Sequence, residues 1–335
     1  MKKRMLFFMV MLIIMSMTAF AGGGSEESTT TTEEVEPVVL RLAETHSADY
    51  PTTMGDYKFA ELVEERTNGR IVIEIFHSKQ LGEEKAVIEQ VQFGAIDFTR
   101  VSISPLAAFY KPFDALQMPY LYRNADHMWK VLNSSIGDEF LEGVEDANFI
   151  GLCWYESGAR SFYVKTPLTS PADLVGLKIR VQQSALMVGL VEAFGAIAQP
   201  MPFGEVYSAI QTGVIDGAEN NWPSYYSTGH YEVATNYIID EHTRVPEILV
   251  ASKLTFDKLS AEDQAIVIQA AKDSVDYQRQ MWAEFEEVSM AAVEANGNVV
   301  TYLTDNSEWQ AAVQSMYDDL DADLQAVVAE IRAVR

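Results

Sequence analysis

The 335-residue chain is long enough to bury the cores of two domains of ordinary size. Its formal charge of −25 argues against nucleic acid or an anionic membrane surface as a partner, because both are polyanions that would repel it. A single cysteine, Cys153, excludes a disulfide framework within the chain, so burial of apolar residues must stabilise the fold.

The N-terminus has the pattern of an export signal. Three basic residues at positions 2–4 precede the apolar run at 6–20, and small residues stand where a signal peptidase needs them, at Ala19 and Ala21. An uncleaved anchor is the alternative, but the run is short and is followed by GGGSEES rather than by positive charge. We expect residues 1–21 to be removed on export to the periplasm, and residues 22–36 to form a flexible tether.

From residue 37 onward, short β-rich runs alternate with amphipathic segments, which predicts an α/β fold with mainly parallel sheets. Helices are predicted over 54–69, which ends at an Asn-Gly pair, and over 83–94. The predicted strands, rich in β-branched and aromatic residues, are 38–43, 70–76, 95–101, 149–155, 177–181, 247–253 and 298–303.

The last third of the chain is predicted to start with one long helix, capped by Ser260 and ending at Asn296-Gly297. At roughly 1.5 Å per residue it exceeds about 50 Å, so we expect it to brace two lobes. A further helix is predicted from residue 306 to the end. The expected architecture is a two-lobed α/β protein of the periplasmic binding type with a ligand cleft between the lobes. Lobe I is predicted to comprise 37–157 and 246–285, and lobe II 158–245 and 286–335.

Three arginines are candidates for holding an anion. Arg180 ends a predicted strand just before a helix that begins near Ser184, and ligands of α/β proteins gather at the carboxyl ends of strands. A guanidinium can hold a carboxylate by two parallel hydrogen bonds. The alternative for Arg180 is a surface position on an edge strand. Arg160, at a loop-to-strand junction, either points into the cleft or pairs with a neighbouring acid, and Arg100 has the same ambiguity.

In the run QTGVIDGAENNWPSYY (211–226), the part after the Asp-Gly turn groups a carboxylate, two amides and three aromatic residues. Gly213 is expected to end a helix, and Glu219 and Asn220 to be displayed on a loop after the Asp-Gly turn. Amides both donate and accept, so Asn220 suits a carboxylate or a hydroxyl. Asn221 is expected to cap the next helix instead.

The loop after the first strand, residues 43–53, offers acidic and aromatic side chains close together. Acidic acceptors suit sugar hydroxyls, and aromatic faces cover the apolar face of a sugar ring. For His46, the alternative is a loop residue without a ligand. The candidate contacts to a hydroxyl-bearing ring are Glu44, His46, Asp49, Glu219, Trp222 and Tyr225.

Enzyme motifs are missing from the sequence. There is no G-x-S-x-G, no phosphate loop, no dinucleotide fingerprint and no H-E-x-x-H, and the five histidines have no close ligand spacing. No catalytic residue, metal site or cofactor is therefore predicted.

From residue 37 to the end, the chain resembles solute-binding proteins of tripartite ATP-independent periplasmic (TRAP) transporters, the DctP-like group that includes C4-dicarboxylate and sialic-acid binders. The resemblance rests on three motifs: GLKIRV (176–181), AFGAIAQPMPFGEVYSAIQTGVIDGAEN (193–220) and FHSKQLGEEKAVIEQVQFGAIDF (76–98). It implies a protein that closes on its ligand and delivers it to the membrane subunits of a transporter.

The resemblance also implies roles for three residues: Arg180 pairs with the ligand carboxylate, Arg160 assists and Asn220 contacts the ligand. The segments ETHSADYPTT (44–53) and AENNWPSYYSTGHYE (218–232) are similar to those of hexuronate binders. The expectation is a monomeric periplasmic protein that binds glucuronate or galacturonate. The alternatives are a binder of C4-dicarboxylates or other organic acids, a protein that presents its ligand to a sensor, and an exported sugar-acid enzyme.

Overall fold

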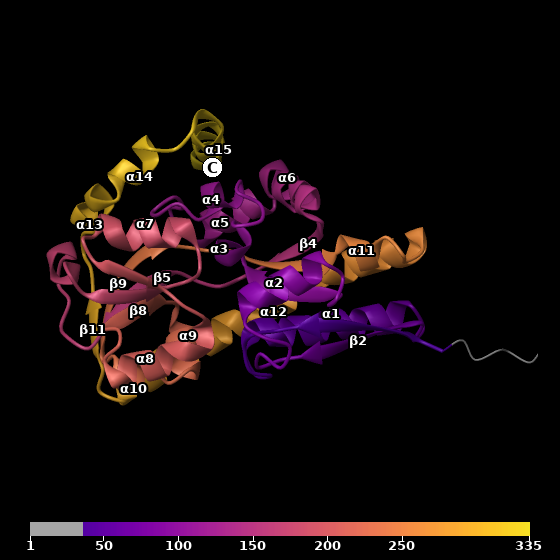
Figure 1. Cartoon of the computed structure of the whole chain (residues 1–335), viewed down its shortest axis with the longest axis horizontal. Coiled ribbons are helices and arrows are strands. Elements are labelled where there is room, and N and C mark those ends of the chain that lie inside the picture. The colour runs from indigo at the N-terminus through magenta and orange to yellow at the C-terminus, as the bar shows by residue number, and fades with distance from the viewer. Residues whose placement is uncertain (1–35) are drawn as a thin grey trace, which may run out of the picture. The chain divides into compact units, whose positions relative to one another are not determined.

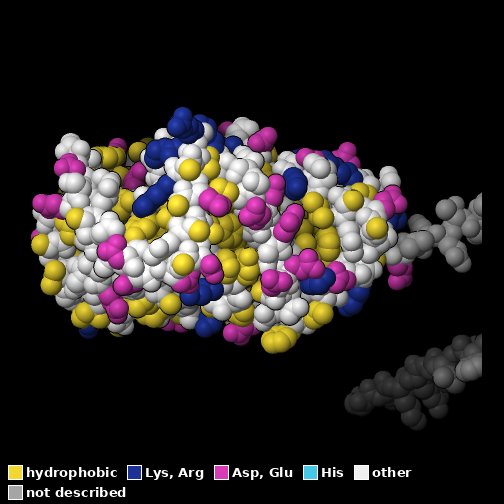
Figure 2. Space-filling model, turned by 90° about the horizontal axis from the view of Figure 1, so that it is seen from above, with side chains coloured by type: hydrophobic (Ala, Val, Ile, Leu, Met, Phe, Trp, Pro, Cys, Tyr) yellow, Lys and Arg dark blue, Asp and Glu magenta, His cyan; other side chains and the backbone are white. Residues whose placement is uncertain are grey.

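The computed structural model describes residues 36–335, in which two β-sheets are flanked by helices (Figure 1). The expected export signal (1–21) and all of the expected tether except Glu36 lie outside the described residues. Within residues 36–335, no helix combines the length and apolarity that a membrane crossing requires. On the face seen in Figure 2, acidic side chains are spread widely, whereas basic ones occur in smaller groups.

The first sheet has five strands, with two parallel pairs at one side and an antiparallel strand near the other. β1 is parallel to β2 and β3, whereas β10 is antiparallel to both of its neighbours. The spatial order is β2 (Ile71–Phe76), β1 (Val38–Ala43), β3 (Phe98–Ser102), β10 (Glu247–Ser252) and β4 (Phe149–Tyr155). Between or beside these strands in sequence lie α1 (Pro51–Arg66), α2 (Glu84–Gln92), α3 (Ile103–Leu106), α4 (Phe113–Leu116), α5 (Ala125–Leu132), α6 (Ser135–Gly143), η1 (Val144–Ala147) and α11 (Lys253–Phe256).

The second sheet has six strands and the same mixture of directions. β5 is antiparallel to both neighbours, β9 and β8, and the other neighbouring pairs are parallel. The order is β11 (Val299–Tyr302), β9 (Asn236–Thr243), β5 (Arg160–Val164), β8 (Gly217–Asn220), β6 (Lys178–Val181) and β7 (Ile197–Pro200). Its helices are η2 (Pro171–Leu174), α7 (Ala185–Ala193), η3 (Phe203–Glu205), α8 (Val206–Thr212), α9 (Trp222–Ser227) and α10 (His230–Val233).

The chain crosses between the sheets through two short segments. Residues 156–159 join β4 to β5, and residues 244–246 join β9 to β10. Because each crossing is so short, the incoming strand starts at the edge where the parallel strands of its new sheet end, and it runs against them. The expectation of mainly parallel sheets is therefore wrong for β5 and β10. Both crossings bring strand ends from the two sheets to one place.

The long helix α12 (Ala261–Ala295) has 35 residues and packs on α1 and β4 as well as on α9. Its predicted cap is present, since the Ser260 side chain accepts from the backbone N–H of Asp263. The side chain of Gln278 in this helix hydrogen-bonds both backbone groups of Glu156 in the first crossing. Its Oε1 accepts from the N–H of Glu156 at 2.8 Å, and its Nε2 donates to the Glu156 oxygen at 3.0 Å. The prediction that one helix braces elements of both lobes is confirmed.

After α12 and β11, the chain forms three helices where one was predicted: α13 (Ser307–Ala312), α14 (Gln314–Asp318) and α15 (Ala322–Ala333). Figure 1 shows them leading from the second sheet to α4. The apolar face of α15, with Leu324 and Ile331, packs into the core that includes α4 and β4. The lobe boundaries stay a prediction, although α15, which was expected in lobe II, packs on elements that were expected in lobe I.

Seven predicted strands are present, but four of the observed ones were missed: β5, β7, β8 and β9. The prediction that Glu219 and Asn220 stand on a loop is wrong, because both lie on the buried strand β8. The Asp-Gly pair does form the entry to that strand. Gly213 ends α8 with a left-handed φ of 78°, as expected, and the Asn221 side chain caps α9 by accepting from the N–H of Ser224.

A buried network of charges joins the central strands of the second sheet. Arg160 of β5 binds Glu219 of β8 through two hydrogen bonds, of 2.5 Å and 2.9 Å. His242 of β9 lies 3.5 Å from the same carboxylate and 2.9 Å from that of Asp240. Burial lowers the pKa of His242, but Asp240 and Glu219 outweigh this and raise it to about 9. The histidine is therefore a cation at neutral pH, and it supports the side chain that orients Arg160.

We expect Gly217→Ala to destabilise the second sheet. A Cβ atom at this position of β8 would lie 2.2 Å from the backbone oxygen of Tyr163, so the paired strands would have to separate. A loss of about 1–3 kcal/mol in the free energy of unfolding is expected, measured by urea denaturation. Gly189→Ala in α7 is the matched control, since nothing lies within 4 Å of its added Cβ, and a gain of about 0.5–1 kcal/mol is expected there. Equal effects at the two glycines would contradict the packing argument.

We expect the charged His242 to make stability fall as pH rises. Its folded pKa of about 9 lies above the ordinary value of 6.5. The stabilisation is thus complete below pH 6.5 and is lost as pH rises through 9. The contribution is on the order of 3 kcal/mol. The free energy of unfolding, measured in urea at pH 6.5 and at pH 9.5, should differ less between the two pH values in His242→Gln than in the unmodified chain. His77→Gln changes a residue outside this network and should keep the same pH dependence of stability as the unmodified chain. If His242→Gln also kept it, His242 would not be the group responsible.

Candidate functional site

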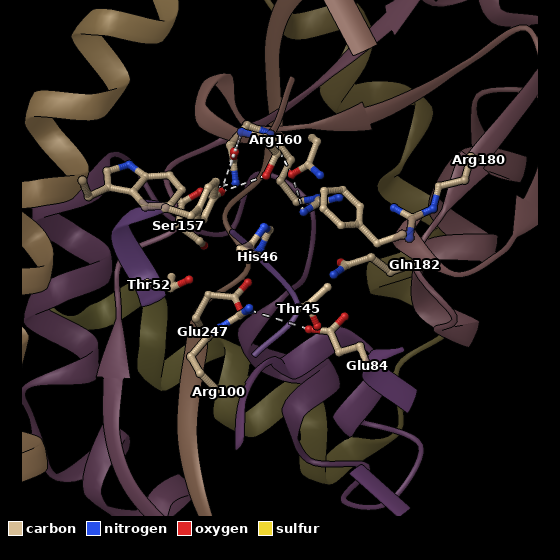
Figure 3. Close-up of a pocket in the computed structure, with 16 residues that line it drawn as sticks. Thr45, His46, Thr52, Glu84, Arg100, Ser157, Arg160, Arg180, Gln182 and Glu247 are labelled. Carbon is tan, nitrogen blue, oxygen red and sulfur yellow. Dashed lines mark hydrogen bonds and ion pairs between the residues drawn. The ribbon is translucent and has the colours of Figure 1, made fainter. Parts of the chain in front are cut away.

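A polar cavity lies where the two sheets meet, and its empty space, including the part open to solvent, is about 410 Å³. In Figure 3, side chains from the first-sheet elements face others from the second sheet across this space. Carboxyl ends of strands supply several of them, as is common for ligand sites in α/β proteins. The lining residues are Thr45, His46, Tyr50, Thr52, Glu84, Arg100, Ser157, Arg160, Arg180, Gln182, Phe203, Asn220, Asn221, Ser224, Glu247 and Trp282.

Arg180 is a buried cation that has no carboxylate within ion-pair distance among the described residues. It lies near the end of β6, between β8 and β7, so the alternative of an exposed edge-strand arginine is excluded. Its Nε and one terminal nitrogen donate to the backbone oxygen of Met201, at 3.1 Å and 2.9 Å. Burial lowers the pKa of Arg180, and Glu219 only partly offsets this. A guanidinium that is buried without an anion favours the entry of one from solution.

Arg160 begins β5, next to the first crossing segment, and both of its expected roles occur together. It pairs with Glu219 and also lines the cavity. Its remaining terminal nitrogen donates to Asn220 Oδ1 at 3.0 Å, and the same oxygen accepts from the N–H of Asn221 at 2.9 Å. With that oxygen occupied, the Asn220 amide nitrogen remains as a donor at the cavity wall. Burial raises the pKa of Glu219, but Arg160 lowers it to about 2, so the pair is fully ionised.

Arg100, near the end of β3, has a very different environment from Arg180. Its Nε donates to Glu44 at 2.7 Å, a second bond joins the same two side chains, and a terminal nitrogen donates to Glu247 at 2.6 Å. Glu84 lies 3.7 Å away. Burial raises the pKa of Glu44, but Arg100 outweighs it and lowers the value to about 2. One ionised carboxylate thus already balances the charge of Arg100.

Ring systems from both sides close the cavity between these charged groups. His46 stacks on Tyr50 with ring centroids 3.8 Å apart, and the edge of Phe203 from the other side meets His46 at 5.3 Å. Trp282 of α12 packs edge-on against Tyr50. Burial lowers the pKa of His46 to about 3, and Arg100 acts in the same direction, so the imidazole is neutral at physiological pH. These faces suit the apolar side of a small ring.

Half of the residues proposed from the sequence line this cavity. They are Arg180, Arg160, Asn220, Arg100 and His46. Glu219 and Glu44 lie directly behind it, each bound to an arginine of the lining.

The other three proposed residues lie elsewhere. Asp49 is exposed, and Trp222 and Tyr225 are buried in a separate apolar core, where the Tyr225 hydroxyl donates to the Ala234 oxygen. The expectation that these two aromatic residues cover a ligand ring at this cavity is therefore wrong.

Sequence reasoning missed several residues of the lining, chiefly Glu84, Glu247, Gln182, Phe203 and Trp282. Glu84 and Phe203 belong to the motifs that carry the family resemblance, which was a usable signal. Trp282 lies in the middle of a long amphipathic helix, and no local pattern distinguishes it from a core residue. In the described part of the chain, no group of three or more His, Cys, Asp or Glu side chains could hold a metal ion.

A family model described as bacterial extracellular solute-binding protein, family 7, matches residues 42–323. A TRAP periplasmic solute-binding protein from a Bradyrhizobium species, in complex with galacturonate, is 45% identical, with a TM-score of 0.86 over 88% of this chain and 99% of that chain. The corresponding protein of Xanthobacter autotrophicus, with bound galacturonate, is 43% identical with a TM-score of 0.86, covering 88% of this chain and 100% of that one.

A third structure, from Chromohalobacter salexigens with bound D-glucuronate, is 35% identical with a TM-score of 0.86, and the match covers 88% of this chain and 100% of that chain. The two-lobed α/β fold and the resemblance to TRAP binding proteins are thereby confirmed. The chain belongs to family 7 of the bacterial extracellular solute-binding proteins, the DctP family, whose members serve TRAP transporters.

Proposed function

We propose that this protein captures a hexuronate, galacturonate or glucuronate, in the cavity between its sheets and delivers it to the membrane subunits of a TRAP transporter. One observation carries this proposal: Arg180 is a buried guanidinium without an anionic partner in the described chain, and it lines the cavity between the sheets. A ligand carboxylate would supply the missing charge.

The chemistry of the lining favours a hydroxylated ring at the other end of such an acid. Neutral His46 and Phe203 offer ring faces, while Glu84, Glu247 and Gln182 offer oxygen acceptors. Hydroxyl groups are the donors that such acceptors need. The related structures with bound galacturonate and glucuronate support the same class of ligand. The amide nitrogen of Asn220 is the donor that we assign to the carboxylate beside Arg180.

Capture without conversion is the activity that we assign. The family to which the chain belongs consists of binding proteins for solutes. Galacturonate incubated with the protein and recovered unchanged would support this assignment, and the appearance of a new product would overturn it.

Arg180→Ala should weaken hexuronate binding by roughly 30-fold or more, since removal of one partner of a buried ion pair costs about 2–5 kcal/mol. Isothermal calorimetry with galacturonate and glucuronate measures this change. Arg180→Lys should recover only part of the loss, because an ammonium cannot make two parallel hydrogen bonds. Arg66→Ala is the control: this arginine lies outside the cavity and pairs with Asp273. Unchanged affinity in Arg180→Ala would show that the carboxylate binds elsewhere.

Export is the second testable part of the proposal. Cleavage after Ala21 should leave a mature chain that begins at Gly22. Mass spectrometry of the periplasmic fraction of an expressing bacterium measures the N-terminus directly. Substitution of Ala21 by a bulky residue such as Phe should leave the longer precursor in the membrane fraction, whereas Ser25→Phe in the expected tether should not. A full-length chain in the periplasm would contradict the assignment.

A further inference from the structure

The cavity has two arginine-bearing sides whose charges are balanced in opposite ways. Arg160 and Arg180 project from the second sheet, whereas Glu84, Arg100 and Glu247 project from elements of the first (Figure 3). On the second-sheet side, Glu219 balances Arg160 and leaves the charge of Arg180 free. On the first-sheet side, Glu44 balances Arg100 and leaves Glu84 and Glu247 in excess.

The excess carboxylates are held firmly and have little contact with solvent. Glu84 Oε1 accepts from the N–H of Ser102 at 2.9 Å, and the side chains of Glu84 and Glu247 are 17% and 9% exposed. Burial raises the pKa of Glu247 to about 7, against the opposing effect of Arg100, and burial also raises the pKa of Glu84. Each of the two groups can accept a hydrogen bond from a hydroxyl in either protonation state.

Gln182, two residues beyond Arg180, adds an independent observation. It lines the same cavity, it is 7% exposed, and its Oε1 has no hydrogen-bond partner within the described chain. A buried acceptor without a donor carries a desolvation penalty, so a hydrogen bond from a ligand to this oxygen would be favourable. Among the residues that the structure describes, the cavity therefore has one cation without an ion-pair partner, Arg180, and several hydrogen-bond acceptors.

We propose that Glu84 and Glu247 determine specificity by admitting the hydroxyl-bearing end of a monocarboxylate and rejecting a second carboxylate at that end. This inference rests on the proposed function and narrows it, because it separates a hexuronate from the corresponding hexarate. Oxidation of C1 of galacturonate gives galactarate, which has a carboxylate at both ends. A diacid held at Arg180 would bring its second charge against the carboxylates of Glu84 and Glu247, and like charges in such a position are strongly repulsive.

The test is calorimetry with D-galacturonate and galactarate at pH 8, above the pKa of about 7 of Glu247. The unmodified protein should bind galacturonate roughly 100-fold or more tightly than galactarate. Glu84→Gln and Glu247→Gln should each reduce this ratio about tenfold, since each removes one negative charge and retains a hydrogen-bond acceptor. The ratio compares two ligands on one variant, so a partial loss of folded protein does not alter it.

Glu89→Gln is the matched control. Glu89 lies on α2 like Glu84, but it is exposed to solvent, so the same change of charge should leave the ratio intact. Affinities for the two acids within tenfold of one another in the unmodified protein would overturn the inference while leaving the proposed function standing. An unchanged ratio in both Gln variants would also overturn it. Absence of binding to galacturonate and glucuronate alike would instead contradict the proposed function.

Discussion

The unequal compensation of three buried guanidinium groups is the constraint on which the rest of the site depends. Arg160 is matched by one carboxylate, Arg100 by more than one, and Arg180 by none within the described chain. A buried charge is tolerated only with partners, so each arginine needs a carboxylate, from the chain or from a ligand, beside it. The strong overall negative charge of the chain does not oppose this arrangement, because charges beyond about 8–10 Å are screened at physiological salt.

The sheets supply the geometry that this balance of charge requires. Arg180 and Asn220 stand at the ends of parallel strands, whereas Arg160 and Glu247 begin the two strands that run against them. All four positions meet at one place because the chain crosses between the sheets twice by the shortest route. A fold with mainly parallel strands, as expected from the alternation of strands and helices, would not have brought Arg160 and Glu247 there.

Local patterns predicted much of the secondary structure, and the exceptions have physical causes. The cap at Ser260 and the end of α8 at Gly213 depend on neighbours in sequence, so residue type sufficed. Strand β8 reads Gly-Ala-Glu-Asn, which has no strand propensity, and it exists because β5 and β6 lie on either side of it. Among site residues, the strand end left Arg180 open between a cleft position and a surface position, and only the family resemblance favoured the cleft. Trp222 and Tyr225 were misplaced because an aromatic residue beside a site and one in a core look alike in sequence.

The two crossing segments also determine how the protein can move. The Ser157 hydroxyl donates to the Val245 oxygen, so one crossing is tied to the other. Glu156 is fixed by Gln278 at both backbone groups. A rotation of one sheet against the other would have to change backbone torsions in both crossings, among them those of the left-handed Gly158. Ser157 lines the cavity and its backbone oxygen accepts from Asn221, so this crossing forms part of the cavity wall. Any such rotation would therefore also displace part of the wall that a ligand contacts.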